Sequence, residues 1–215
     1  MKIVLMILVI CSLALPQDLP GWGFYGGVGM NNVKFSESGA LTPKPLMGRL
    51  AGVSKGVMLG GLHLFVGAGF GQRGFKIEES GYIDINEDDL VFTDEGQGVS
   101  GSMKVETSMN YLDAWMVMPY PVGPGLAWAG PIAGIFLSGK MKIKLEIDLL
   151  EIPISQSEDI DEGPDDPEFG IIIGYSYPLP IMDGKLNLNG GYYLGLIEHD
   201  DITFNSIFAH LSYRL

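Results

Sequence analysis

The sequence has one cysteine, few basic residues and, beyond its first residues, no helical periodicity of useful length. The single cysteine, Cys11, lies in an apolar run near the start. The rest of the chain therefore has no disulfide framework, thiol nucleophile or cysteine-based zinc site. Only 13 Lys and Arg stand against 26 Asp and Glu. The absence of a basic patch excludes nucleic acid as a partner.

The first residues have the pattern of a signal peptide. Met1-Lys2 supply a positive start, Ile3–Leu15 an apolar run, and Ser12-Leu13-Ala14 a small-x-small cleavage pattern. The apolar run is shorter than the roughly 17–25 residues of a membrane-spanning helix. We expect residues 1–15 to be a cleaved signal peptide. No composition shift divides the remainder, so we expect residues 16–215 to form a single domain.

What the sequence does have is glycine, 31 in 215 residues, and apolar residues at alternate positions. The stretch Ala127–Ile147 has the longest such alternation. Its odd positions include Ala127, Ala129, Ala133, Ile135, Leu137, Met141, Ile143, Leu145 and Ile147, opposite glycine, serine and lysine. Side chains on a strand alternate between two faces, so this pattern predicts one long strand with an apolar face along its whole length.

Similar alternation predicts eight antiparallel strands. Their expected ranges are Trp22–Phe35, Leu46–Leu59, His63–Ile77, Ser102–Met118, Ala127–Ile147, Phe169–Tyr177, Leu186–Ile197 and Ile202–Leu215. Short turns are expected at Gly60-Gly61, Pro119–Gly125 and Pro178–Gly184, and long acidic loops at Glu78–Gly101 and Asp148–Glu168. Short turns at one end and longer loops at the other are typical of outer-membrane barrels. The predicted fold is all-β, an eight-stranded antiparallel up-and-down transmembrane β-barrel.

The apolar faces are expected to meet lipid. The opposite faces are crowded with Gly, Ser and Asn, and eight strands leave an interior wide enough only for side chains. An open sheet edge in hydrocarbon would leave backbone groups unpaired, so the sheet must close. Aromatic residues at the short-turn ends predict an interfacial girdle: Trp22, Tyr120, Trp128, Tyr177 and Tyr213. Trp128 has the inward parity of its strand, and the alternative for it is to plug the rim of the barrel. We expect the outer membrane of a Gram-negative bacterium as the location and its lipid as a partner.

The last strand alternates apolar and polar residues up to Leu215. This ending resembles the terminal signal that the outer-membrane barrel-assembly machinery reads, so that machinery is an expected partner during insertion. Leu215 replaces the usual terminal Phe.

Four short motifs resemble the PorT-like outer-membrane β-barrel proteins. They are Gly26-Gly27-Val28-Gly29, Gly71-Gln72-Arg73-Gly74-Phe75, Tyr111-Leu112-Asp113 with Pro119-Tyr120, and Tyr192-Tyr193-Leu194-Gly195-Leu196. The family usually has Glu where this chain has Asp113. The resemblance implies a small eight-stranded barrel, no cofactor and, for most members, no assigned reaction.

Arg73 and Asp113 are expected to face inward on neighbouring strands. A charge inside a narrow barrel needs a counter-charge, because desolvating it alone is very costly. We predict that the two form a lumenal ion pair with a structural role. A proton or substrate relay is the alternative.

The loop residues Asp84, Asn86, Asp88 and Glu95 have the ligand spacing of an EF-hand calcium loop. Asp89 occupies the position where that loop needs Gly, and no helical pattern flanks it. The pattern favours a solvated acidic loop, and the alternative is a weak divalent-cation site, for calcium, or cation bridging to anionic lipopolysaccharide.

His199, with Asp200 and Asp201, falls at the predicted outer rim. A histidine there could act as a general base for water, so a rim hydrolase of lipid A or peptide is one possible function. The favoured function is non-enzymatic: a structural, adhesive or interaction role through the acidic extracellular loops. A soluble periplasmic ligand-binding barrel is a third possibility.

Lys140, Lys142 and Lys144 come after more residues than the roughly 9–11 that a strand needs to cross a membrane. We therefore expect the strands at Ser102–Met118 and Ala127–Ile147, the fourth and fifth in order, to protrude beyond the outer surface. An exposed edge there could pair with a strand of a partner protein.

Overall fold

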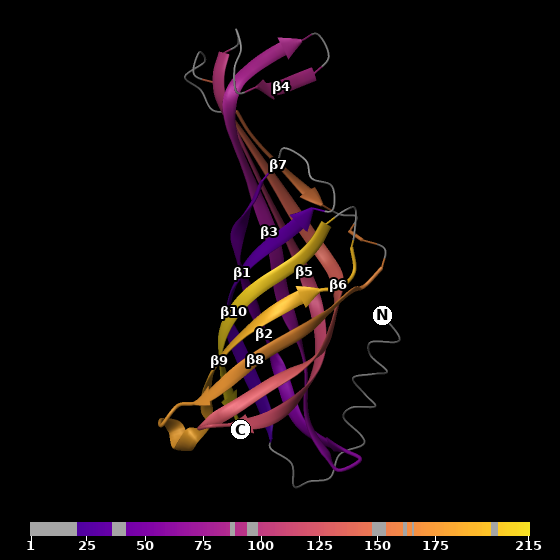
Figure 1. Ribbon diagram of the computed structural model, residues 1–215, viewed down its shortest axis with the longest axis vertical. Coiled ribbons are helices and arrows are strands. Elements are labelled where there is room, and N and C mark those ends of the chain that lie inside the picture. The colour runs from indigo at the N-terminus through magenta and orange to yellow at the C-terminus, as the bar shows by residue number, and fades with distance from the viewer. Residues whose placement is uncertain are drawn as a thin grey trace.

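Eight antiparallel strands close into a barrel (Figure 1). The computed structural model describes residues 21–35, 42–86, 89–93, 99–147, 154–160, 163–164, 166–198 and 202–215, with backbone alone for 82–93 and 99. Around the ring run β1 (Trp22–Phe35), β2 (Pro43–Leu59), β3 (Leu62–Asn86), β5 (Val99–Val122), β6 (Gly125–Ile147), β8 (Glu168–Pro178), β9 (Leu186–Gly195) and β10 (Ile202–Arg214). β10 pairs with β1, which closes the ring. The predicted eight-stranded up-and-down barrel is confirmed.

The turns at one end of the barrel are short. Gly60 and Gly61, with φ of 56° and 84°, join β2 to β3 in a backbone conformation that glycine adopts at no steric cost. Between β5 and β6 the turn takes only residues 123–124, so the expected turn at 119–125 was too long. Pro119 and Pro121 extend β5 instead. They lie beyond Val117, the last β5 residue paired with β3, where a strand tolerates proline. A short 3-10 turn, η1 (Met182–Gly184), joins β8 to β9.

Large apolar side chains cover the outer wall of the barrel, and we call this surface the apolar belt. Its exposed members include Trp22, Phe24, Val28 and Met30 on β1, Phe70 on β3, Met116, Met118 and Tyr120 on β5, Ile135 and Leu137 on β6, Phe169, Ile171, Ile173 and Tyr177 on β8, Leu188, Tyr192 and Leu194 on β9, and Ile207 and Leu211 on β10, each 38–70% exposed. From the short-turn end the belt covers residues 22–30 on β1, 62–70 on β3 and 169–177 on β8.

The inside of the barrel holds aromatic and hydrogen-bonding side chains. Trp128 is buried and its indole Nε1 donates a hydrogen bond to Ser176 Oγ at 3.0 Å. Ser176 in turn donates to Asn189, and Asn189 donates to Ser212, so the hydrogen bonds form a chain inside the barrel. Trp128 therefore does not belong to the expected outer girdle, because its position on β6 has inward parity. Trp22, Tyr120 and Tyr177 do lie on the outside.

A β-bulge divides β6 at Leu137. Asn110 of β5 pairs with Ser138 and Tyr111 with Phe136, so Leu137 has no partner opposite it. One extra residue turns every later side chain to the other face. Ile135 and Leu137 are exposed outside, but Met141, Ile143 and Leu145 are half-buried on the inner face, opposite exposed lysines. The expectation of one apolar face along the whole strand was wrong.

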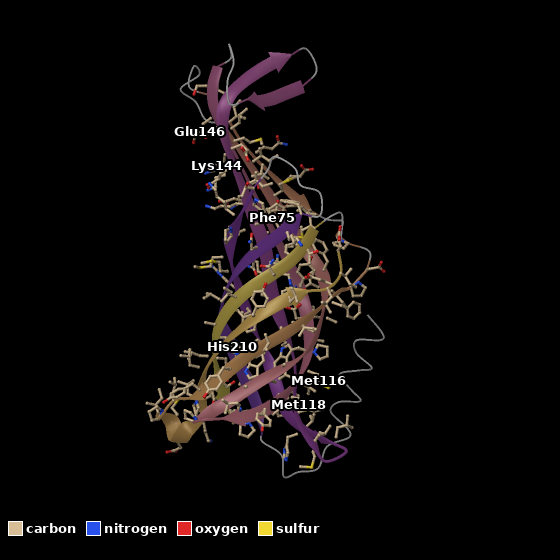
Figure 2. The ribbon with its side chains drawn as sticks, in the orientation of Figure 1. Phe75, Met116, Met118, Lys144, Glu146 and His210 are labelled. Carbon is tan, nitrogen blue, oxygen red and sulfur yellow. The ribbon has the colours of Figure 1, made fainter. Side chains whose placement is uncertain are left out.

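Beyond Gln72, Asn110 and Ser138, β3, β5 and β6 continue outward as a ribbon, and the start of β2, Pro43–Pro45, pairs with its base opposite Phe75–Ile77 (Figure 1). β4 (Asp89–Thr93) pairs with β3, and β7 (Ile154–Ile160) pairs with β6, so these strands widen the ribbon to five. We call the parts of β3, β5 and β6 beyond these three residues, together with β4 and β7, the protruding sheet. The long loops expected at 78–101 and 148–168 were wrong over these strands. Met116 and Met118 mark the wall of the barrel and Lys144 and Glu146 the protruding sheet (Figure 2).

Within the described residues, no helix is long and apolar enough to cross a membrane.

Candidate functional site

A buried ionic cluster lies in the lumen near the level where the barrel becomes the protruding sheet. Arg73 on β3 and Asp113 on β5 both point inward, and Glu168 begins β8. The Nη2 of Arg73 is 2.8 Å from Oδ1 of Asp113, and its Nε is 3.4 Å from Oε2 of Glu168. The three side chains are 7%, 13% and 2% exposed. One guanidinium thus lies between two carboxylates in a space largely closed to water.

Two tyrosine rings enclose the guanidinium of Arg73. Its Cζ lies 4.4 Å from the ring centre of Tyr111 and 4.9 Å from that of Tyr193. The Tyr193 hydroxyl also donates a hydrogen bond to Glu168. Cation–π contact strengthens when the charge is desolvated, and bonds to ionised groups are the stronger hydrogen bonds. The two rings therefore help the two carboxylates to offset the desolvation cost of the buried Arg73 charge.

Two glycines make room for this cluster. A methyl group at Gly134 would come within 2.7 Å of Oδ1 of Asp113, and one at Gly71 would overlap Oδ2 of the same side chain. Glycine at these two inward positions allows the Arg73–Asp113 pair to lie against the barrel wall.

An apolar cluster closes the lumen on the outer side. Val33, Phe75, Ile77 and Phe204 are buried there, and the rings of Phe35 and Phe75 meet edge to face at 5.8 Å. Towards the short turns, a cavity of about 150 Å³ reaches residues such as Tyr25, Trp115 and His210. Ligand pockets usually measure about 300–1,000 Å³. The lumen is therefore filled mainly by the protein's own side chains.

The predicted site residues have different outcomes. The structure brings Arg73 and Asp113 together. Asp84 and Asn86 lie on β3 opposite β4 rather than in a loop. The other calcium candidates, Asp88 and Glu95, fall outside the side chains that the structure describes, as do His199, Asp200 and Asp201. Among the described residues, no group of three or more His, Cys, Asp or Glu side chains could hold a metal ion.

Glu168, Tyr111 and Tyr193 belong to the cluster but were not predicted as its members. Glu168 was expected at the end of a loop, one residue before a strand that begins at Phe169. Extending that strand's alternation back by one position would have put Glu168 on the same face as Gly170 and Gly174. The inward tyrosines gave no comparable signal, because strand alternation does not say which strands lie across the lumen from each other.

The fold and the filled lumen define a small closed antiparallel β-barrel. The sequence matches no family model and no curated protein. Among solved structures it is similar to Ail, the attachment invasion locus protein of Yersinia pestis, at 12% identity and a TM-score of 0.45, over 92% of this chain and 100% of that one. It is similar to Neisserial surface protein A at 11% identity and a TM-score of 0.42, over 93% and 100%.

The outer membrane protease OmpT from Escherichia coli is similar at 10% identity and a TM-score of 0.43, over 95% of this chain and 100% of that one. At these identities the likenesses concern the fold alone.

Proposed function

We propose that this chain is an integral outer-membrane protein of PorT-like type. It crosses the membrane as a closed barrel and holds the protruding sheet at the outer surface. The apolar belt is the observation that carries the proposal. On each of the strands measured above it covers the roughly 9–11 residues that a tilted strand needs to cross the hydrocarbon core. A soluble ligand-binding barrel would keep such side chains inside, so the belt argues against that alternative.

The filled lumen supports an anchor rather than a channel. Eight-stranded barrels leave an interior just wide enough for side chains. Here the ionic cluster and the apolar cluster of Val33, Phe75, Ile77 and Phe204 lie across it. We expect purified protein in planar bilayers to give no stepwise conductance. Regular single-channel steps from the wild-type protein would contradict this part of the proposal.

The interaction role is proposed for the protruding sheet, which contains strands from both acidic stretches of the sequence. The β6 edge that we expected to accept a partner strand is occupied by β7 from Gly139 to Leu145. On the β6 side of the protruding sheet, the edge strand is therefore β7, whose residues are almost all exposed. We propose that a partner strand would add to β7, because main-chain hydrogen bonds there are unused in the described part of the chain.

Heat-modifiable gel mobility tests membrane insertion most simply. Folded outer-membrane barrels resist unfolding in cold detergent, so the unheated protein should run faster than the boiled protein. The wild type should also require detergent for extraction from outer-membrane fractions. Release into plain buffer as a stable monomer would overturn the proposal. Depletion of the barrel-assembly machinery should reduce the heat-modifiable form.

Protease treatment of intact cells tests the orientation. Cleavage should fall in the protruding sheet and its connections, and the short turns at 60–61 and 123–124 should stay intact until the cells are opened. Cleavage at the short turns in intact cells would reverse the proposed orientation.

A further inference from the structure

Lysines gather on one face of the protruding sheet. The outward positions of β2, β3, β5 and β6 align in rows across the sheet: Lys76 pairs with Lys44 and Glu106, and Glu106 with Lys142. In the next row Glu78 pairs with Lys104, and Lys104 with Lys144. We call this surface the lysine face, made of Lys44, Lys76, Glu78, Lys104, Glu106, Lys140, Lys142, Lys144 and Glu146. Six of the 13 basic residues in a strongly acidic chain thus lie together, so the expectation that the chain has no basic patch was wrong.

Two glutamates of the lysine face, Glu78 and Glu106, are already paired with lysines. Glu78 is 2.7 Å from Lys44 and 3.0 Å from Lys76, and Glu106 is 2.8 Å from Lys104. Hydrogen bonds from Lys44 and Lys76 lower the pKa of Glu78 to about 2. A hydrogen bond from Lys104 likewise lowers the pKa of Glu106. These carboxylates therefore stay ionised and paired at neutral pH.

Positive charge remains along β6. Lys140 pairs with Asp159 of β7 at 3.4 Å, but within the described residues no ion pair includes Lys142 or Lys144. Both side chains are exposed on the outer face. The bulge at Leu137 produces this display, because without it the β6 lysines would turn to the inner face and Met141, Ile143 and Leu145 to the outer one.

The height of the lysines above the apolar belt indicates the kind of ligand. Lys140, Lys142 and Lys144 follow Ser138 by roughly 7, 13 and 20 Å along the strand, at about 3.3 Å per residue. The strand is tilted, so each height is somewhat less. A headgroup layer extends only about 5–8 Å beyond the hydrocarbon core. Lys142 and Lys144 thus lie above the phosphates of a simple phospholipid, at the level of phosphates carried on a larger sugar headgroup.

We propose that the lysine face binds the phosphate groups of a phosphorylated glycolipid, of the lipopolysaccharide type, in the surrounding outer leaflet. This inference rests on the proposed insertion of the barrel into an outer membrane. Lys142 and Lys144 are the main contacts, and the glycolipid phosphates would pair with these two lysines, which the glutamates of the face do not. Bound glycolipid would hold the base of the protruding sheet against the membrane surface.

Purified lipopolysaccharide carrying a fluorescent label tests the proposal by titration into the folded protein in zwitterionic micelles. Each lysine near an anionic lipid surface contributes about a five- to tenfold change in affinity, so Lys142→Gln with Lys144→Gln should weaken binding roughly 30-fold. The matched control, Lys55→Gln with Lys185→Gln, removes the same charge at the short-turn end of the barrel, where Lys55 pairs with Trp22, and should leave the affinity within about twofold. Dephosphorylated lipopolysaccharide should bind the wild type as weakly as the intact lipid binds the double variant.

Heat-modifiable mobility of every variant separates a binding defect from a folding defect. Equal affinity of the wild type and the Lys142/Lys144 variant, with both heat-modifiable, would overturn this inference and leave the proposed membrane insertion standing. Soluble polyphosphate that binds with the same lysine dependence and equal affinity would overturn the choice of a lipid. A wild-type chain that never becomes heat-modifiable would overturn both proposals.

Discussion

The two halves of β6 have a similar alternation of apolar residues with small or polar ones, but their apolar residues lie on opposite faces of the strand. Below the bulge, Ile135 and Leu137 point out of the barrel. Above it, Ile143 and Leu145 turn to the inner face, and the lysines between them point out. The difference follows the proposed surroundings, with lipid outside the lower half and water outside the upper half. A single unpaired residue allows one strand to satisfy both.

The largest expected effect comes from the ionic cluster, which lies where the two regions meet. Arg73→Met leaves Asp113 and Glu168 buried without their cation, and should lower the free energy of unfolding by about 3–5 kcal/mol. Adding Asp113→Asn and Glu168→Gln to that variant should recover much of the loss. Denaturant unfolding in micelles, followed by tryptophan fluorescence, measures both. A triple variant no more stable than Arg73→Met would contradict this account of the cluster.

A lysine placed in each region should separate lipid from water. Ile173→Lys puts a charge at the middle of the apolar belt and should cost about 2–4 kcal/mol of folding free energy in a bilayer. Ser157→Lys adds the same charge at an exposed position of β7 in the protruding sheet, and should change stability by less than about 0.5 kcal/mol. Equal costs for the two variants, measured by unfolding from lipid vesicles, would remove the proposed boundary.

A smaller effect is expected from the glycines that make room for the cluster. Gly134→Ala should cost about 1–3 kcal/mol, because the new methyl group meets the carboxylate of Asp113. Gly190→Ala is the matched control, since a methyl group there meets nothing within 4 Å. Thermal unfolding of the two variants checks the difference. If the Gly190 variant proved the less stable, the packing around Asp113 would need another description.

The smallest expected effect is a titration in the protruding sheet. Hydrogen bonds from Lys44 and Lys76 lower the pKa of Glu78 to about 2. The pairing of Glu78 therefore stabilises the folded sheet fully at pH values above the ordinary pKa of a glutamate. That support should be lost as the pH falls through about 2. The carboxyl chemical shift of Glu78 should have its midpoint near that value, and Lys44→Gln should raise it. An ordinary midpoint in the wild type would contradict the pairing.

Much of the barrel could be predicted from the sequence, because strand alternation and Gly60-Gly61 are local signals. β1 was predicted to the residue, and β10 within one. The extension of β5 and β6 beyond the barrel was expected, but β4, β7 and the outer part of β3 were missed because acidic composition hides their alternation, although β4 and β7 each pair with a strand close before them in the sequence, as Asp89 does with Asn86. The bulge at Leu137 has no residue-level signature, so the inward turn of Met141, Ile143 and Leu145 could not be foreseen. Pairing across the lumen, as between Arg73 and Glu168, depends on ring closure rather than on sequence spacing.

Spin labels placed along β6 test the central claim most directly, and a chain produced without residues 1–15 provides a background without other thiols. In lipid vesicles, labels at Ala129 and Ile135 should collide with oxygen, which concentrates in hydrocarbon. Labels at Lys142 and Lys144 should collide instead with a water-soluble nickel complex, with the change falling between Leu137 and Ser138. Nickel access at Ile135 equal to that at Lys142 would show that water covers both halves of the strand, and the account of a lipid-facing belt would be wrong.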